Sequence, residues 1–327
     1  MQVTLNIQSL PVKEENYAET MQTVVEPALA ALRKEGAFEG YDGSKIHYEY
    51  YKKADAVGAV VISHGFTESA EKFREMSYNF LQMGFSVFAV DHRGHGKSFR
   101  YNPDDLQTVT IRRFEDYVED LHCFVTSVVR PAIGNLPLYL YAHSMGGAIA
   151  VQYLQTYPAT FDKAVLSAPM IQAQMPIPPA VTMAMTKFFG LIGKQDARVF
   201  VHKGFDPTAT YENSHDTSEA RYNYYKAKRI ADPLLQTSSA SYRWVEESIK
   251  VVKKNLDPAR CVRISCPVLL CQPAEDKSVI SERENDFIAL VPHGRLVQIP
   301  DSRHEIYLSV DSALLIYLQT IEAFLKE

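Results

Sequence analysis

Residues 138–150, LYLYAHSMGGAIA, place a serine between two apolar runs. The first run is short and continuously apolar, as in a buried strand, and the second has the composition of a helix start. Small residues flank Ser144, with Ala142 two positions before it and Gly146 two positions after it. A sharp strand-to-helix turn requires such neighbours and can expose the serine hydroxyl as a nucleophile. The alternative is an ordinary serine that caps the N-terminus of a helix.

Strand and helix patterns alternate on both sides of this turn. Buried strands are predicted at GAVVIS, FSVFAVD, LPLYLYA, KAVLSAP, CPVLLCQP and GRLVQIP, and a β-hairpin turns at Asp42 and Gly43. Helices are predicted over 26–35, 68–83 (ended by Gly84), 112–130 (ended by Pro131), 144–157, 241–256 and 312–327. Continuously apolar strands that alternate with helices predict an α/β fold, with a mostly parallel sheet covered on both faces.

The alternation stops between residues 171 and 240. This stretch is first rich in Met, Pro and Phe and then in Tyr and charged residues. We expect a helical cap over 171–240, inserted into a core made of residues 1–170, with an N-terminal helical extension, and 241–327.

Composition excludes several classes of protein. The chain has 327 residues and a formal net charge of −5, without a long basic block, so no nucleic-acid partner is expected. Its four cysteines lack C-x-x-C spacing, which predicts free, mostly buried thiols and neither metal nor cofactor. No signal peptide or membrane span is predicted. A cytoplasmic protein is expected, with peripheral membrane contact left open.

A serine nucleophile needs a base and an acid to orient that base. His304 follows the predicted strand GRLVQIP, so it should reach the same sheet edge as Ser144. His215 and His293 also come late in the chain, but neither follows a core strand. Asp276 follows the strand PVLLCQP and is the expected acid, with Glu275 as the adjacent alternative. The resulting order, Ser144 then Asp276 then His304, is the order of the α/β hydrolases.

Two backbone amides are expected to stabilise a tetrahedral oxyanion. One is that of Met145, directly after the nucleophile, and the other is that of Phe66, in the loop after GAVVIS. His64 is expected to support this loop. The glycine-rich loop DHRGHGKS lacks phosphate-loop spacing and is expected to be a structural turn, with Arg93 and His95 bracing the site edge.

Several of these segments resemble the bacterial lysophospholipases, in the monoacylglycerol-lipase-like branch of the α/β hydrolases. They are VVISHGFTESAEKF, LQMGFSVFAVDHRGHGKS, FEDYVED, AHSMGG and DSRHEI, with SYRWVEESI and SHDTSEARYNYY outside the catalytic motifs. The resemblance extends from about residue 27 to the C-terminus, and this branch commonly has Ala at the position of Ala142. It implies hydrolysis of the acyl ester of a lysophospholipid or a monoacylglycerol by the triad Ser144, Asp276 and His304, with Phe66 and Met145 at the oxyanion hole.

The substrate is less well defined than the chemistry. A stripe of Met and Phe between Met170 and Leu191 suits an acyl chain or a membrane surface, but it also suits packing of the cap on the core. The alternatives are a small-ester esterase, an aminopeptidase-type hydrolase, and a non-catalytic protein that binds lipid or a partner protein. The sequence does not indicate the oligomeric state.

Overall fold

The fold centres on one eight-stranded sheet, described by a computed structural model for residues 7–327. The strand order is β1-β2-β4-β3-β6-β7-β9-β10. Strand β2 runs antiparallel to β1 and β4, and all the other neighbours are parallel, as predicted. The strands are β1 (Arg33–Glu39), β2 (Lys45–Tyr51), β3 (Gly58–Ser63), β4 (Phe85–Val90), β6 (Leu138–His143), β7 (Lys163–Ser167), β9 (Val268–Pro273) and β10 (Gly294–Ile299). A second, two-stranded sheet pairs β5 (Thr108–Val109) with β8 (Ser239–Ala240).

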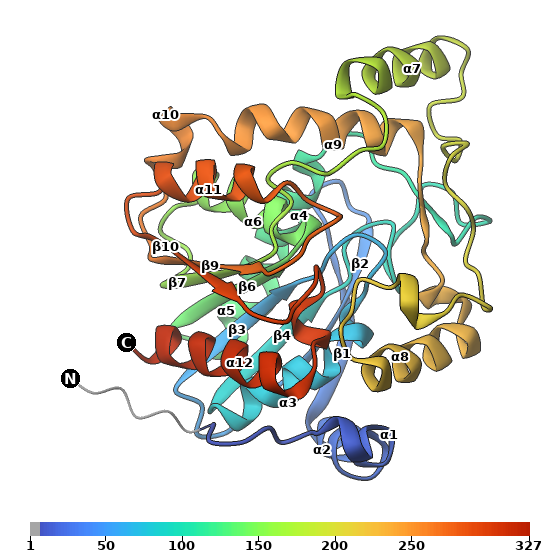
Figure 1. The fold of residues 1–327 in the computed structure, drawn as a ribbon. Helices are drawn as coiled ribbons and strands as arrows, with labels where there is room; N and C mark the ends of the chain where they lie inside the picture. The colour runs from blue at the N-terminus through green and yellow to red at the C-terminus, as the bar shows by residue number, and fades with distance from the viewer. Residues whose placement is uncertain (1–6) are drawn as a thin grey trace.

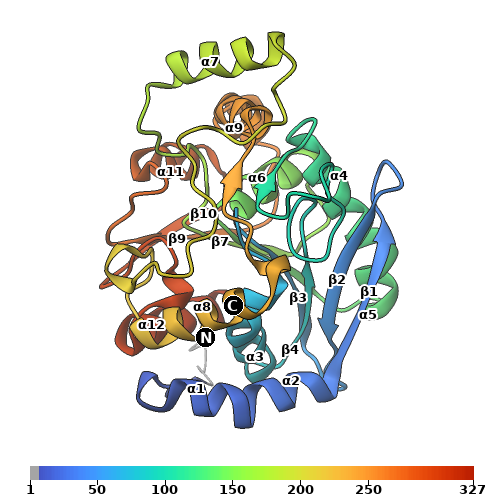
Figure 2. The same ribbon diagram turned by 90° about the vertical axis from the view of Figure 1, so that its right-hand side faces the viewer.

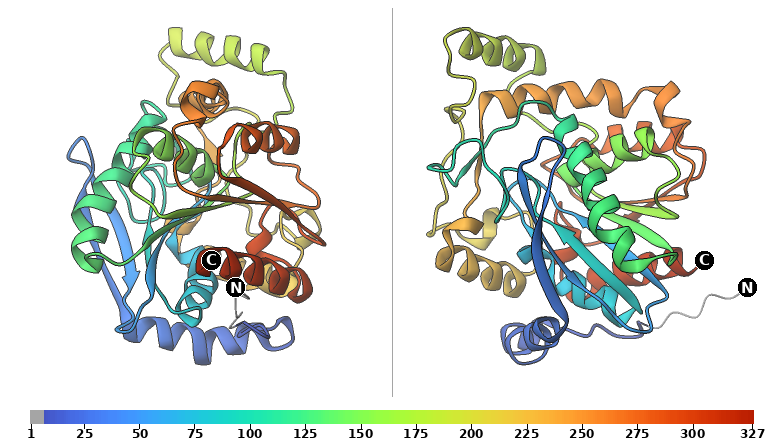
Figure 3. Two further views of the ribbon diagram at one scale, coloured as in Figure 1. Left: turned by 90° about the vertical axis from the view of Figure 1, so that its left-hand side faces the viewer. Right: turned by 180° about the vertical axis from the view of Figure 1, so that it is seen from behind.

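Helices cover both faces of the large sheet (Figure 1). One face carries α4 (Glu115–Phe124), α5 (Arg130–Ile133), α6 (Met145–Thr156), α9 (Tyr242–Asn255), α10 (Pro258–Cys261) and α11 (Ser281–Leu290). The other carries α1 (Tyr17–Thr20), α2 (Glu26–Leu32), α3 (Arg74–Gln82) and α12 (Asp311–Lys326). In the rear view of Figure 3, the green helices α4 and α6 lie against the sheet.

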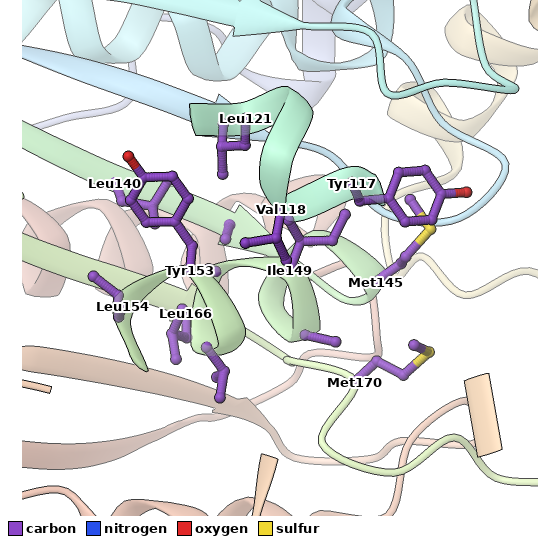
Figure 4. Close-up of a cluster of buried hydrophobic side chains, with 14 of the residues drawn as sticks. Tyr117, Val118, Leu121, Leu140, Met145, Ile149, Tyr153, Leu154, Leu166 and Met170 are labelled. Atoms are coloured by element: carbon purple, nitrogen blue, oxygen red, sulfur yellow. The ribbon is translucent and has the colours of Figure 1, made fainter. Parts of the chain in front are cut away.

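The two faces of the strands feed two separate hydrophobic cores. Along β3, Val61 packs on the α6 side while Val60 and Ile62 pack on the α3 side, because successive strand residues point to opposite faces. Figure 4 shows the first core, where side chains of α4 and α6 meet beside Leu140 of β6 and Leu166 of β7. Full burial on both faces explains why these strands are apolar without alternation.

Three predicted elements differ from the structure. The N-terminal helix begins at Tyr17 and ends at Leu32, since residues 33–39 pair with β2 as an edge strand. The helix over 112–130 continues to Ile133 and stops at Gly134, whose φ is 61°. Pro131 does not end it, because Pro131 lies in the first turn after a π-helical segment (Val125–Val129), where its missing N–H costs little. Strand β10 is a largely exposed edge strand and not a buried one.

The segment 171–240 contributes α7 (Pro179–Leu191) and α8 (Glu219–Ala231). Helix α7 packs on α9 and forms the outermost layer of the molecule (Figures 1 and 2), whereas α8 packs beside α1. No helix within residues 7–327 is long and apolar enough to cross a membrane. Residues 1–6, part of the predicted N-terminal extension, lie outside the described residues.

Candidate active site

Ser144 occupies a strained turn between β6 and α6. Its φ of 52° and ψ of −116° are rare for a residue with a side chain, and such strain is concentrated at functional sites. Its backbone is held by the hydrogen bond from Ser144 N to Ser167 O (3.1 Å) and by Met170 N donating to Ser144 O (2.8 Å). Ser144 is the N-cap residue of α6, but its hydroxyl makes no hydrogen bond to the helix N-terminus, so its side chain does not act as a helix cap.

The small residues around Ser144 are required by close backbone contacts. A Cβ on Gly146 would lie 2.1 Å from the carbonyl oxygen of Ser63, and one on Gly147 would lie 2.5 Å from Pro169 Cβ. Ala142 faces a different environment, because it is still a strand residue, and its methyl group is buried in the hydrophobic core. Alanine therefore replaces glycine at this position without steric cost.

The structure brings His304 and Asp276 to Ser144. His304 Nε2 is 2.9 Å from Ser144 Oγ, and His304 Nδ1 is 2.7 Å from Asp276 Oδ2. A carboxylate only accepts, so His304 carries its proton on Nδ1, and Nε2 is left to accept the serine proton. Glu275, the alternative acid, is exposed on the same loop.

Asp276 is held as an anion. Its Oδ1 accepts from the N–H groups of Ser278 (2.7 Å) and Val279 (3.0 Å). Burial acts to raise the pKa of Asp276, but the hydrogen bond and charge of His304, with these amides, outweigh it and keep the pKa below its ordinary value. An ionised carboxylate here both orients the imidazole and stabilises its charged form.

The loop that carries Phe66 is fixed by His64. The N–H of His92 donates to His64 Nε2 (2.9 Å), so His64 is protonated at Nδ1 and donates to Gly65 O (2.7 Å). The Phe66 ring packs at 4.1 Å from the Trp244 ring. Met145 is the first residue of α6, where backbone N–H groups lack intrahelical acceptors.

A buried network that the sequence analysis missed lies behind His304. His143 Nδ1 is 3.1 Å from Glu68 Oε2, and His143 Nε2 is 3.2 Å from the carbonyl oxygen of His304. Both partners are acceptors, so both ring nitrogens of His143 must donate, which makes it an imidazolium. Burial acts to lower its pKa, but the charge and hydrogen bond of Glu68 outweigh burial and raise it.

Glu68 connects this network to the Phe66 loop. It accepts from Gly65 N (2.5 Å), from Tyr307 Oη (2.5 Å) and from Lys72 Nζ (3.4 Å), in addition to His143. Burial acts to raise the pKa of Glu68, but His143 and Lys72 hold it well below its ordinary value. In the sequence, the role of Glu68 was indicated only by its position three residues after Gly65, from which its carboxylate can reach the backbone of this loop.

The DHRGHGKS loop makes its contacts with neighbouring parts of the chain. Asp91 accepts from Ala70 N (2.8 Å) and Lys97 N (3.0 Å), and the fully buried Arg93 guanidinium pairs with Asp120 (2.6 Å). These bonds join the loop to the 3-10 turn that precedes α3 (Ala70–Phe73) and to α4, as expected of a structural turn. The four cysteines are free, and three of them are buried, as predicted.

Ser144 and His304 line a cavity of about 920 Å³. Most of its wall is apolar and comes from the segment after β7 and from α9, including Met170, Met175, Ile177, Met185, Val199, Trp244 and Val245. His215 also lines it, with its ring centroid 6.0 Å from that of His304, although no core strand precedes it. Within residues 7–327, no group of His, Cys, Asp or Glu side chains is arranged to hold a metal ion.

The parallel sheet, the strained serine turn and the imidazole beside it define the α/β-hydrolase class. Residues 54–311 match the family model described as serine aminopeptidase, S33, and the chain belongs to this family.

Comparisons with individual proteins agree with this class. The chain is 29% identical to lysophospholipase L2 of Escherichia coli K12 over 310 residues, covering 89% of this chain and 87% of that protein. It is 32% identical to a monoacylglycerol lipase of Mycolicibacterium smegmatis over 163 residues, covering 50% of this chain and 55% of that protein. A solved monoglyceride lipase from Saccharomyces cerevisiae has the same fold, with a TM-score of 0.72 and 20% identity over 90% of this chain and 95% of that one.

Proposed function

We propose that this protein is a serine hydrolase that cleaves the acyl ester of a lysophospholipid or a monoacylglycerol. The observation that carries the proposal is the chain of hydrogen bonds from Asp276 through His304 to Ser144, at a large cavity whose wall is more apolar than polar. The relatives named lysophospholipase and monoacylglycerol lipase support the same substrate class.

The mechanism follows from the geometry of these groups. Ser144 Oγ attacks the acyl carbonyl while His304 Nε2 takes its proton, and Asp276 stabilises the resulting imidazolium. The amides of Phe66 and Met145 donate to the oxyanion. His304 then protonates the departing glycerol oxygen, and water, activated by the same imidazole, hydrolyses the acyl-enzyme.

An aminopeptidase-type reaction is the second candidate, favoured by the description of the family model. Recognition of a free α-ammonium group would need an available carboxylate near Ser144. The carboxylates that line the cavity are Glu68 and Glu305, and both are paired with Lys72. The apolar wall and these occupied carboxylates favour the acyl ester.

We propose that residues 171–240 form a cap that covers the cavity. We also propose that this cap contacts the membrane surface. Helix α7 is apolar on two faces: Phe189 stacks on Tyr242 of α9 at 3.9 Å, while Val181, Phe188 and Leu191 on the other face are exposed. An exposed apolar helix face at the edge of the molecule suits shallow insertion between lipid head groups. The four free cysteines fit a cytoplasmic location.

A fluorophosphonate probe and a substrate panel test the reaction. We expect labelling of Ser144 in the wild-type protein, none in Ser144→Ala, and unchanged labelling in Ser248→Ala, which removes another hydroxyl that lines the cavity. Ser144→Ala should lower kcat roughly 10⁴-fold or more with folding retained. Turnover of aminoacyl amides without turnover of long-chain lysolipids or monoacylglycerols would refute the ester assignment.

Sedimentation with phospholipid vesicles tests the membrane contact. Replacing Phe188 and Leu191 with serine should reduce the bound fraction. Val262→Ser is the matched control, since Val262 is 62% exposed but lies at the end of α10. Equal binding of both variants would contradict a role of α7.

A further inference from the structure

We propose that a second cavity, next to the one that holds Ser144, binds the phosphodiester of a lysophospholipid head group; this rests on the proposed function. The second cavity has a volume of about 270 Å³. It shares part of its wall with the first, because Thr67, Lys203, His215, Ser238 and Glu305 line both. The two cavities therefore form one path with an apolar part and a polar part.

Three cationic side chains line the polar cavity without a carboxylate partner. They are Lys203, Lys226 and Arg229, and none forms an ion pair with a residue in the described range 7–327. Lys226 Nζ donates to the carbonyl oxygen of Ala209 (2.6 Å), and Arg229 donates only to main-chain carbonyls, among them that of Leu235 (3.1 Å). Carbonyl oxygens satisfy donors but do not neutralise their charge, so an anion in this cavity gains charge-assisted hydrogen bonds.

The carboxylates of the polar cavity do not cancel these cations. Glu305 is paired with Lys72 at 2.5 Å. Asp216 is buried beside Glu305, and burial together with the Glu305 charge raises its pKa well above the ordinary value, which favours the neutral form. Asp206 is exposed and accepts from the backbone N–H and hydroxyl of Thr208. The charges of Lys72 and Glu305 cancel, and the three remaining cations outnumber the carboxylates Asp206 and Asp216 whichever form Asp216 takes.

The arrangement of the two cavities matches the order of groups in a lysophospholipid. Methionine and aliphatic side chains of the first cavity suit the acyl chain, and the ester lies at Ser144. His215 stands at the shared wall, near His304 and with Nδ1 3.3 Å from Ser278 Oγ, where the glycerol would pass. The phosphodiester then enters the cationic cavity, and the Tyr222 ring, which also lines it, is available to an ethanolamine or choline ammonium. A monoacylglycerol would leave this cavity without an anion.

The test compares two substrates with the same acyl chain, below their critical micelle concentrations. They are a lysophosphatidylethanolamine and a monoacylglycerol, and kcat/KM is measured for wild type, Lys203→Gln and Lys226→Gln. Each substitution should lower kcat/KM for the phospholipid on the order of tenfold, while the monoacylglycerol value changes less than about twofold. Lys253→Gln is the matched control, because Lys253 is an exposed lysine of α9 that lines neither cavity.

The outcomes separate this inference from the proposed function. Equal effects of the lysine substitutions on both substrates, or no effect on either, would overturn the head-group site while leaving ester hydrolysis intact. Loss of the proposed function would instead appear as turnover that survives Ser144→Ala. As a second arm, glycerophosphoethanolamine should inhibit monoacylglycerol hydrolysis competitively and more strongly than inorganic phosphate. Equal inhibition by the two would overturn the lipid assignment in favour of a general anion site.

Discussion

Replacing His143 with leucine should destabilise the protein in a pH-dependent way. His143 is 1% exposed and donates one hydrogen bond to Glu68 and one to the carbonyl oxygen of His304. Leucine removes both and leaves a buried carboxylate with one cationic partner fewer. Breaking a buried charged pair of this kind costs about 3–5 kcal/mol in the free energy of unfolding.

The sign of the pH dependence follows from the raised pKa of His143. Because the pKa in the folded protein exceeds that in the unfolded chain, the stabilisation is complete below the unfolded value and is lost as the pH rises through the folded value. Urea unfolding should therefore show the largest difference between wild type and His143→Leu near about pH 6, and a smaller one in alkaline solution.

A control substitution and an activity measurement sharpen this prediction. His293→Gln changes an exposed histidine and should leave the unfolding free energy within about 0.5 kcal/mol of wild type. His143→Leu should also reduce kcat more than it changes KM, because the carbonyl of His304 loses its support. A stability loss below about 1 kcal/mol, or a loss independent of pH, would refute the assignment of His143 as a buried imidazolium.

The remaining predictions concern three other sites. Asp276→Asn should lower kcat on the order of 10⁴-fold in steady-state assays, because an amide favours the wrong imidazole tautomer; a loss under tenfold would contradict this. Gly146→Ala should prevent stable folding, measured by circular dichroism and soluble yield, because its Cβ would lie 2.1 Å from Ser63 O, whereas Gly190→Ala, with open space around its Cβ, should be tolerated. Burial raises the pKa of Glu284 to about 8, so the wild-type protein loses stability as the pH rises from about 4.5 to about 8 and this buried carboxyl group ionises. Glu284→Gln cannot ionise, so its melting temperature should exceed that of the wild type by an amount that grows over this pH range. A difference in melting temperature that does not change with pH would contradict this prediction.

Local patterns were sufficient to predict most of the fold. The short apolar strands and the helices between them predicted the parallel sheet, because strands that are buried on both faces are apolar throughout and do not alternate with polar residues. The errors arose where tertiary contacts override local pattern. Residues 33–35 continue an apparent helix but pair with β2, and Pro131 is tolerated because a π-helical segment precedes it.

For the candidate site, the sequence selected groups that follow strands. Ser144, Asp276 and His304 each come after a strand of the parallel part of the sheet, and parallel strands end at one sheet edge, so their meeting could be anticipated. His215 and Glu68 could not be found in this way. His215 reaches the site from the long segment after β7, and Glu68 is recognised only by the hydrogen bonds it accepts.

The sequence by itself therefore determined the sheet, the strained serine turn and the chain order of the three side chains proposed to react, because these depend on short-range periodicity and on steric limits at single positions. Only the tertiary structure decided the protonation of His143, the support of His304 and the charge of the polar cavity. Those properties depend on which buried donors, acceptors and charges lie within a few ångströms of one another, and the residues concerned are far apart along the chain.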